Sequence, residues 1–476
     1  MPSRRTLTAA LVLLACQVSA QEAEERGDLQ APLQALVRFT PEADIAPGQP
    51  FAISARFVSA AGSDPPVGLQ VAAWLRPISA TNLPCTEAAR AYRSTLGLPT
   101  GAVSLNGPLL AVAMADGAMT FADPDLDLAS ANILAAAKLE EVPSALVPDP
   151  ARQRVLAVLP SRGEIVAVDA LTGQVAILAG GFARPEAVVP ASDGGAWVLD
   201  AGRSALIRIG ADGASLQTIT GVTTLAVTAD GGTAAYTGPG KAALLDLATG
   251  RSLAEFPVDS VASASLPLND PSGTTGVAIL ASDRLELYYS DAPDAPVSIG
   301  LPAPATTLAA PADGRFIFAY DPAGGPVLVV DAVRGRLLQA VGAEVPITEI
   351  AFTARAAFLL RADQQSAGAL FFDTIRADQP AAVREVVLGE ARSGSLPDGT
   401  WMAPLSGGRE LVVVHAESYS GFVLHDNPAM SDKTWPMTRV QLRGGEPRHI
   451  AVLDRSFRET APGEFTGAAT LPAGEA

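Results

Sequence analysis

The sequence predicts an all-β protein: a seven- or eight-bladed β-propeller, with eight blades favoured, plus a small β-sandwich. Three observations predict this fold. A strand unit recurs about every 40 residues, residues 103–442 show almost no helical periodicity, and alternating strands that do not fit the repeat stand at both ends of the chain. The length of 476 residues fits one large repeat array or two to three domains.

The recurring unit is an apolar strand that ends in Asp and leads into a Gly turn. It occurs at Ile165 to Gly173, at Ala243 to Gly250 and at Val327 to Gly335. Alignment on the Asp gives a column of eight positions spaced 36 to 52 residues apart: Asp123, Asp169, Gly210, Asp246, Ser290, Asp331, Asp373 and His425. A period near 40 residues with about four short strands per unit is typical of propeller blades.

The Asp and Gly residues of this column have a structural explanation. An Asp at a strand end can accept hydrogen bonds from backbone N–H groups in a tight turn, and Gly supplies the positive φ that the turn needs. A calcium site would require several oxygens that converge on one point, whereas the repeat spreads these residues around a ring. We therefore expect turns between the third and fourth strands of each blade.

Two of the units carry a more specific pattern. Residues Ile165 to Gly173 and Val327 to Gly335 read strand-Val-Asp-x-x-x-Gly, and Pro185 to Val188 reads Pro-x-x-Val. These motifs resemble the repeats of secreted bacterial YVTN-type propellers and of the related haem-d1-type superfamily. The resemblance covers residues 103–442 and implies a propeller fold, but its motifs are structural and imply no particular activity.

The two ends of the chain predict a second, split domain. Phe51, Ile53 and Phe57 alternate with small or polar residues, as in a half-buried strand, and Pro462 to Leu471 supplies similar strands after the repeats. Both stretches resemble strands of immunoglobulin-like sandwiches in exported bacterial proteins. We expect residues 36–78 and 447–476 to share one incomplete sandwich with an exposed edge, with 79–102 as a connecting segment and 103–442 as the propeller.

The N-terminus has the features of a secretory signal peptide over residues 1–20. Arg4-Arg5 precedes an apolar run from Leu7 to Ala15, and Val18 to Ala20 forms a small-residue cleavage site. The apolar run is too short to span a bilayer, so we expect a mature protein that is not transmembrane and lies in the periplasm or outside the cell. The alternative is a membrane-tethered lipoprotein, because Leu13 to Cys16 resembles a lipobox that would place a lipid anchor on Cys16.

Composition and motifs exclude several functions. The formal net charge of −17 repels phosphate backbones, so nucleic-acid binding is set aside. After leader cleavage Cys85 is the only cysteine, which excludes an internal disulfide and a cysteine-rich metal site. The motifs for covalent haem, serine hydrolases, zinc proteases and phosphate-binding loops are absent. The sequence predicts no cofactor and favours a protein that is not an enzyme, although it leaves that question open.

The candidate binding residues lie in the last units. The interval of 52 residues before His425 is the longest in the column and indicates an insertion between Ser393 and Trp435. Long loops on a rigid scaffold often carry binding residues. We therefore expect ligand or partner contacts at Trp401, Tyr419 and Trp435.

The same region holds the candidate metal ligands. His415 and Glu417 are two residues apart on one predicted strand and share a face. Together with His425 they have the composition of a two-histidine, one-carboxylate metal site. The alternative is that both histidines are ordinary rim residues of the last blade.

These observations lead to one favoured function and one alternative. The favoured function is an exported, non-catalytic propeller that binds a protein partner or acts as a scaffold. The alternative is a periplasmic redox accessory protein or enzyme with a non-covalent haem- or quinone-type cofactor in the propeller channel. This alternative rests on fold analogy alone.

Overall fold

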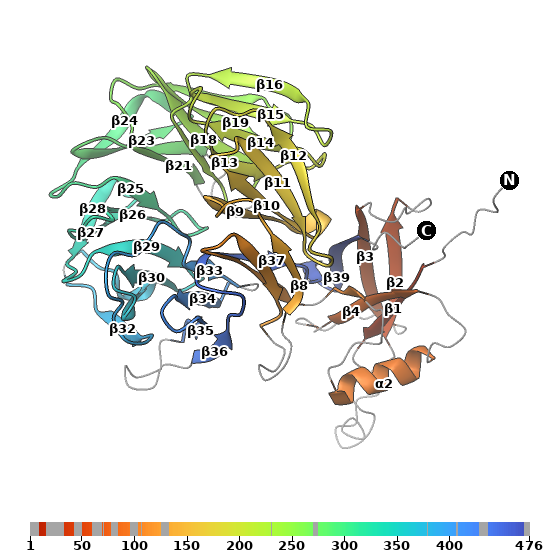
Figure 1. The fold of residues 1–476 in the computed structure, drawn as a ribbon. Helices are drawn as coiled ribbons and strands as arrows, with labels where there is room; N and C mark the ends of the chain where they lie inside the picture. The colour runs from red at the N-terminus through yellow and green to blue at the C-terminus, as the bar shows by residue number, and fades with distance from the viewer. Residues whose placement is uncertain are drawn as a thin grey trace. The chain divides into compact units, whose positions relative to one another are not determined.

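The computed structural model describes residues 9–15, 33–41, 50–59, 69, 71–77, 84–95, 103–105, 107–124, 133–229, 231–269, 275–377, 379–405, 408–427 and 437–470. The chain divides into two compact units, of which unit 1 comprises residues 1–109, 149–154 and 453–476, and unit 2 comprises residues 110–148 and 155–452. Nearly all of the regular structure is β-strand (Figure 1), which confirms the predicted all-β class.

Unit 2 is a propeller built from four-stranded antiparallel sheets, of which the described residues form eight. Seven of them have their strands hydrogen-bonded in chain order. The first three sheets are β9 (Ala145–Asp149), β10 (Arg154–Leu159), β11 (Glu164–Asp169) and β12 (Val175–Gly180); β13 (Pro185–Pro190), β14 (Ala196–Asp200), β15 (Ala205–Ile209) and β16 (Ser215–Thr220); and β17 (Thr224–Val227), β18 (Thr233–Gly238), β19 (Lys241–Asp246) and β20 (Ser252–Pro257).

The next four sheets follow the same order. They are β21 (Ala264–Asn269), β22 (Thr275–Leu280), β23 (Arg284–Tyr289) and β24 (Ala292–Gly300); β25 (Thr307–Ala309), β26 (Phe316–Tyr320), β27 (Val327–Asp331) and β28 (Arg336–Val341); β29 (Ile347–Phe352), β30 (Ala356–Arg361), β31 (Ser366–Phe371) and β32 (Val383–Val387); and β33 (Met402–Pro404), β34 (Glu410–His415), β35 (Ser420–His425) and β36 (Met437–Gln441). Two short 3-10 helices, η1 (Pro150–Arg152) and η2 (Phe372–Thr374), follow β9 and β31.

The remaining sheet of unit 2 combines strands from both ends of the propeller. Its order is β37 (Pro447–Asp454), β6 (Pro108–Met114), β7 (Ala118–Ala122) and β8 (Ile133–Lys138). We expected residues 447–476 to belong wholly to the sandwich, and the structure corrects this for β37. The apolar side chain of Ile450 packs into a core cluster of unit 2, which draws the strand into the propeller.

Burial explains why the sheets stack. The second and third strands are apolar on both faces, as in β14 and β26, where every residue is buried. A sheet with two apolar faces must be covered on both sides. Shared core clusters provide this cover between neighbouring sheets, as where Phe316 of β26 packs with Leu359 of β30.

The aligned Asp and Gly positions lie at, or within two residues of, the ends of the third strands. At Asp169 the carboxylate accepts hydrogen bonds from the backbone N–H groups of Leu171 at 3.0 Å and Thr172 at 2.8 Å. Gly173 closes this turn with a φ of 71°. The expected role of these residues as turn formers between the third and fourth strands is therefore confirmed at this position.

Unit 1 contains a four-stranded sheet drawn from both ends of the chain. Its order is β2 (Leu33–Thr40), β3 (Pro50–Ser59), β39 (Glu464–Thr470) and β38 (Arg458–Ala461). The antiparallel pairing of β3 with β39 places the rings of Phe57 and Phe465 edge to face at 5.5 Å. A sheet shared by the two ends is what a split domain requires; its assignment as an immunoglobulin-like sandwich stays a prediction.

A second sheet of unit 1 has the order β1 (Ala9–Ala15), β4 (Val71–Pro77) and β5 (Val103–Ser104). Strand β1 lies within the expected signal peptide, whose removal stays a prediction. Helix α2 (Cys85–Thr95) occupies part of the expected connecting segment, and its Ala88 and Tyr92 pack on Trp74. No helix in the described part of the chain is long and apolar enough to cross a membrane.

Candidate functional site

Tyr419 lies on the turn between the second and third strands of the β33–β36 sheet. The turn spans residues 416–419, and the backbone N–H of Tyr419 donates to the carbonyl oxygen of Ala416 at 3.1 Å. Tyr419 is 45% exposed and has a φ of 51°, in the left-handed region that bulky side chains rarely adopt. The fold therefore holds an exposed aromatic residue in an unfavourable backbone conformation.

Four other sheets contain the same turn. In each, the last turn residue donates its N–H to the carbonyl three residues earlier and has a positive φ. The residues in this place are Gly117 (83°), Gly163 (62°), Ser204 (48°) and Gln364 (53°). A turn that ends in the left-handed region favours glycine, and a residue with a Cβ costs about 1 to 2 kcal/mol there. Tyr419 thus occupies a position where the repeat geometry favours glycine.

Gln364 shows how the propeller can offset this strain. It is fully buried, its Nε2 donates to the carbonyl oxygen of Val414 at 3.0 Å, and its Oε1 accepts from the backbone N–H of Ala416 at 3.1 Å. These two bonds link the β29–β32 sheet to the β33–β36 sheet. Within the described residues, the phenol of Tyr419 has no comparable hydrogen bond, so the fold gives a reason for Gln364 but none for Tyr419.

His415 holds the same turn through contacts with Ser418. Its Nδ1 lies 2.9 Å from the hydroxyl of Ser418 and its Nε2 lies 3.0 Å from the carbonyl oxygen of Glu390. The residue is only 2% exposed. Both ring nitrogens are therefore engaged within the protein, and the turn that carries Tyr419 is ordered.

The structure does not bring the three candidate metal ligands together. In the β34–β35 hairpin His415 pairs with Ser420 and His425 pairs with Glu410, so the two histidines stand at opposite ends, roughly 17 Å apart at 3.3 Å per residue. The Nδ1 of His425 lies 2.8 Å from Glu410, and Glu417 lies on the turn beside His415. No cluster of three or more His, Cys, Asp or Glu side chains suited to a metal occurs among the described residues.

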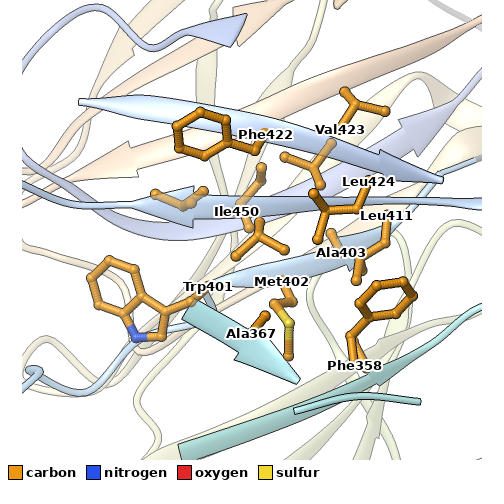
Figure 2. Packing of buried hydrophobic residues seen from close by; sticks show 14 of the residues in the cluster. Phe358, Ala367, Trp401, Met402, Ala403, Leu411, Phe422, Val423, Leu424 and Ile450 are labelled. Carbon is orange, nitrogen blue, oxygen red and sulfur yellow. The ribbon is translucent and has the colours of Figure 1, made fainter. Parts of the chain in front are cut away.

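Trp401 lies in the protein core. It is 2% exposed and belongs, with Phe358, Met402 and Ile450, to an extensive apolar cluster of unit 2 (Figure 2). Its position suits sheet packing and not contact with a ligand. The third expected binding residue, Trp435, falls outside the described residues.

A partly buried carboxyl group that sequence reasoning missed holds the backbone of Trp401 in place. Glu349 of β29 accepts hydrogen bonds from the backbone N–H groups of Trp401 at 2.7 Å and Met402 at 3.2 Å. Burial raises the pKa of Glu349 to about 7, although these two hydrogen bonds act in the opposite direction. The only sequence signal was a charged residue between Ile347 and Ile350 in an apolar strand.

His449 of β37 is the third histidine and is also structural. It is 4% exposed, and its Nδ1 lies 3.4 Å from the hydroxyl of Thr400. Burial, reinforced by the positive charge of Arg448, lowers the pKa of His449 to about 4. The imidazole is therefore neutral at pH 7.

Comparison with known proteins defines the class of the fold. No family model and no curated protein sequence matches this chain. Solved structures do match, and they share the β-propeller fold, in agreement with the propeller resemblance of the repeats.

Two of these structures illustrate the likeness. Apo AztD from Citrobacter koseri is 15% identical, with a TM-score of 0.51, and the match covers 73% of this chain and 98% of AztD. The dihydro-heme d1 dehydrogenase NirN, solved in complex with DHE, is 13% identical, with a TM-score of 0.53 and coverage of 73% and 75%. At these identities the likeness shows the propeller fold alone.

Proposed function

We propose that this chain is an exported, non-catalytic β-propeller that binds a protein partner and serves as a binding or scaffold protein. The observation that carries the proposal is Tyr419, an exposed aromatic residue at a turn position where the repeat geometry favours glycine. Residues held in strained backbone conformations cluster at functional sites. Tyr419 also belongs to the loop-rich last units, where the sequence predicts binding.

The surroundings of Tyr419 suit a partner contact. Tyrosine offers a large amphipathic surface with few rotatable bonds, so its burial against a partner costs little conformational entropy. The turn beneath it is ordered by His415, and the carbonyl oxygen of Tyr419 accepts hydrogen bonds from Leu442 and Gln441. A rigid aromatic residue on an ordered turn is a typical anchor of a protein interface.

The proposal is tested first by photocrosslinking in the native cells. The photoreactive residue p-benzoylphenylalanine replaces Tyr419 in one variant and Ser204 in a control, because Ser204 ends the equivalent turn of another sheet. We expect a discrete crosslinked protein from position 419 and none from position 204. Equal crosslinking at both positions, or none at either, contradicts the proposal.

A substitution then separates binding from stability. In Tyr419→Gly the relief of backbone strain offsets the lost packing of the ring, so the free energy of unfolding should change by less than about 2 kcal/mol. We expect this variant to fold and to lose the crosslinked partner in co-purification, while Ser204→Gly retains it. Retention of the partner by Tyr419→Gly contradicts the proposal. So does a visible absorption band from a cofactor bound to protein purified from its native cells.

A further inference from the structure

A cavity of about 570 Å³ lies between the β21–β24 and β25–β28 sheets of unit 2. Apolar side chains form its walls: Leu268 is buried, Val297 is 40% exposed and Val333, on the turn after β27, is 71% exposed. The hydroxyl of Tyr289 donates to the carbonyl oxygen of Ala332 at 3.0 Å and ties the two sheets together. The volume lies within the range of pockets that hold small ligands.

Two arginines line this cavity, and both keep hydrogen-bonding capacity. The guanidinium of Arg315 stacks over the ring of Phe316 at 4.9 Å. Its charge helps to lower the pKa of Asp331, but among the residues that the structure describes no carboxylate accepts a hydrogen bond from it. Arg334 uses its Nη1 for the buried carboxylate of Asp331 at 2.7 Å. The stacking and the ion pair each orient a planar cation while leaving N–H donors for a further acceptor.

Two acidic residues also line the cavity. Asp313 accepts the backbone N–H of Arg315 at 3.1 Å, so part of its capacity is spent on the turn. Asp291 is exposed, as are Arg315 and Arg334, so water and salt screen all three charges alike. The two guanidinium groups differ from these carboxylates in being oriented by another side chain, Arg315 by Phe316 and Arg334 by Asp331, beside an apolar wall.

We propose that this cavity binds a monocarboxylate with an apolar body, whose carboxylate lies between Arg315 and Arg334. The fork of a guanidinium matches a carboxylate, since both can form two parallel hydrogen bonds. The apolar body lies against Leu268, Val297 and Val333. The same chemistry occurs in free carboxylic acids and at the C-terminus of a polypeptide that ends in an apolar residue.

The test is isothermal titration of the full chain with three probes. These are 3-phenylpropanoate as the free acid, its amide as a neutral control, and N-acetyl-Ala-Leu as a model of a polypeptide C-terminus. We expect the acid or the dipeptide to bind at concentrations up to about 10 mM, with the amide at least about tenfold weaker, because it lacks a charge-assisted bond. Tighter binding of the dipeptide indicates that the ligand is the C-terminus of a polypeptide. Tighter binding of 3-phenylpropanoate indicates that the ligand is a free carboxylic acid.

Three variants locate the site. Arg315→Gln should weaken binding at least about tenfold, whereas Arg336→Gln, an exposed arginine on β28 outside the cavity, should leave it unchanged. Ala295→Trp fills the cavity from an exposed position of β24 and should abolish binding. Circular dichroism and the thermal midpoint establish that each variant is folded.

The outcomes that overturn this site are distinct from those of the Tyr419 experiments. Equal affinity for acid and amide, no binding of any probe, or unchanged binding in folded Arg315→Gln and Ala295→Trp each contradicts the proposal. Because the cavity and Tyr419 belong to different sheets, either proposal can fail while the other stands.

Discussion

Glu349 places an ionisable group where the propeller is otherwise apolar. The first strand of the neighbouring sheet, β33, has only three residues, and the carboxyl of Glu349 supplies acceptors for the N–H groups at its start. A backbone N–H buried without an acceptor costs free energy comparable to a lost hydrogen bond. The carboxyl thus completes the junction between the β29–β32 and β33–β36 sheets, at the energetic cost of its own burial.

The raised pKa of Glu349 predicts a pH dependence of stability. Since its pKa in the folded protein, about 7, is above the ordinary value of 4.5, folding favours the protonated form. This stabilising contribution is complete below about pH 4.5 and is lost as the pH rises through 7. Relative to Glu349→Gln, the free energy of unfolding of the unmodified protein should therefore fall by up to about 3 kcal/mol over this interval.

Urea unfolding of both proteins at several pH values measures this difference. His449, whose pKa is lowered, contributes a pH dependence of opposite sign, but it is present in both proteins and drops out of the comparison. A constant difference between the two proteins from pH 4.5 to 7.5 would show that Glu349 does not titrate as expected.

The turns after the third strands repeat one hydrogen-bonding scheme. At Asp246, Oδ1 accepts the backbone N–H of Ala248 at 2.9 Å and Oδ2 accepts the hydroxyl of Thr249 at 2.8 Å. Gly250 ends the turn with a φ of 72°. The chemistry of Asp and Gly is local, which is why the sequence alone predicted where these turns lie.

Removal of this side chain should destabilise the β17–β20 sheet. Asp246→Ala loses both acceptors and should lower the free energy of unfolding by about 1 to 2 kcal/mol. Asp246→Asn keeps one carbonyl oxygen for Ala248 and should lose less. Asp294→Ala, at an exposed position of β24, is the matched control and should change stability by less than about 0.5 kcal/mol. Chemical denaturation measures all three, and equal effects of the Ala variants at 246 and 294 would contradict the role of the turn.

The burial of a side chain and the sheet to which a strand belongs depend on residues far away in the sequence, so the sequence alone did not predict them. Trp401 and Tyr419 are both aromatic residues of the irregular last units, yet one lies in the core and the other on a strained turn. Trp401 packs among residues from several sheets, and its backbone is bound by Glu349, which lies 52 residues earlier in the chain. Strand β37 was assigned to the sandwich for the same reason, because its alternation of apolar residues suits either sheet and only pairing with β6 decides.

In each unit, a strand from late in the chain pairs with a strand from early in the chain. Strand β37 completes a propeller sheet that otherwise consists of β6, β7 and β8, and β39 pairs with β3 over residues 50–56 and 464–470. Between β3 and β39 lie about 400 residues of chain, so closing this sheet carries a large loop-closure entropy unless the propeller is already folded. We infer that folding of unit 1 depends on prior folding of the propeller.

This pairing predicts that a substitution in β39 lowers the stability of β2 and β3. Phe465 is 4% exposed and packs on Phe57 in the core of unit 1. Phe465→Ala should destabilise this sheet by about 3 to 5 kcal/mol. In hydrogen exchange followed by mass spectrometry, we expect peptides from residues 33–40 and 50–59 to lose protection together with 458–470, while β14 and β26 keep theirs. The control is Phe256→Ala, because Phe256 is a buried aromatic residue of the propeller. This variant should instead lower the protection of the β17–β20 and β21–β24 sheets, which the apolar cluster around Phe256 joins. If Phe465→Ala loses protection only in residues 458–470, the strands at the two ends are independent and do not form one cooperative domain.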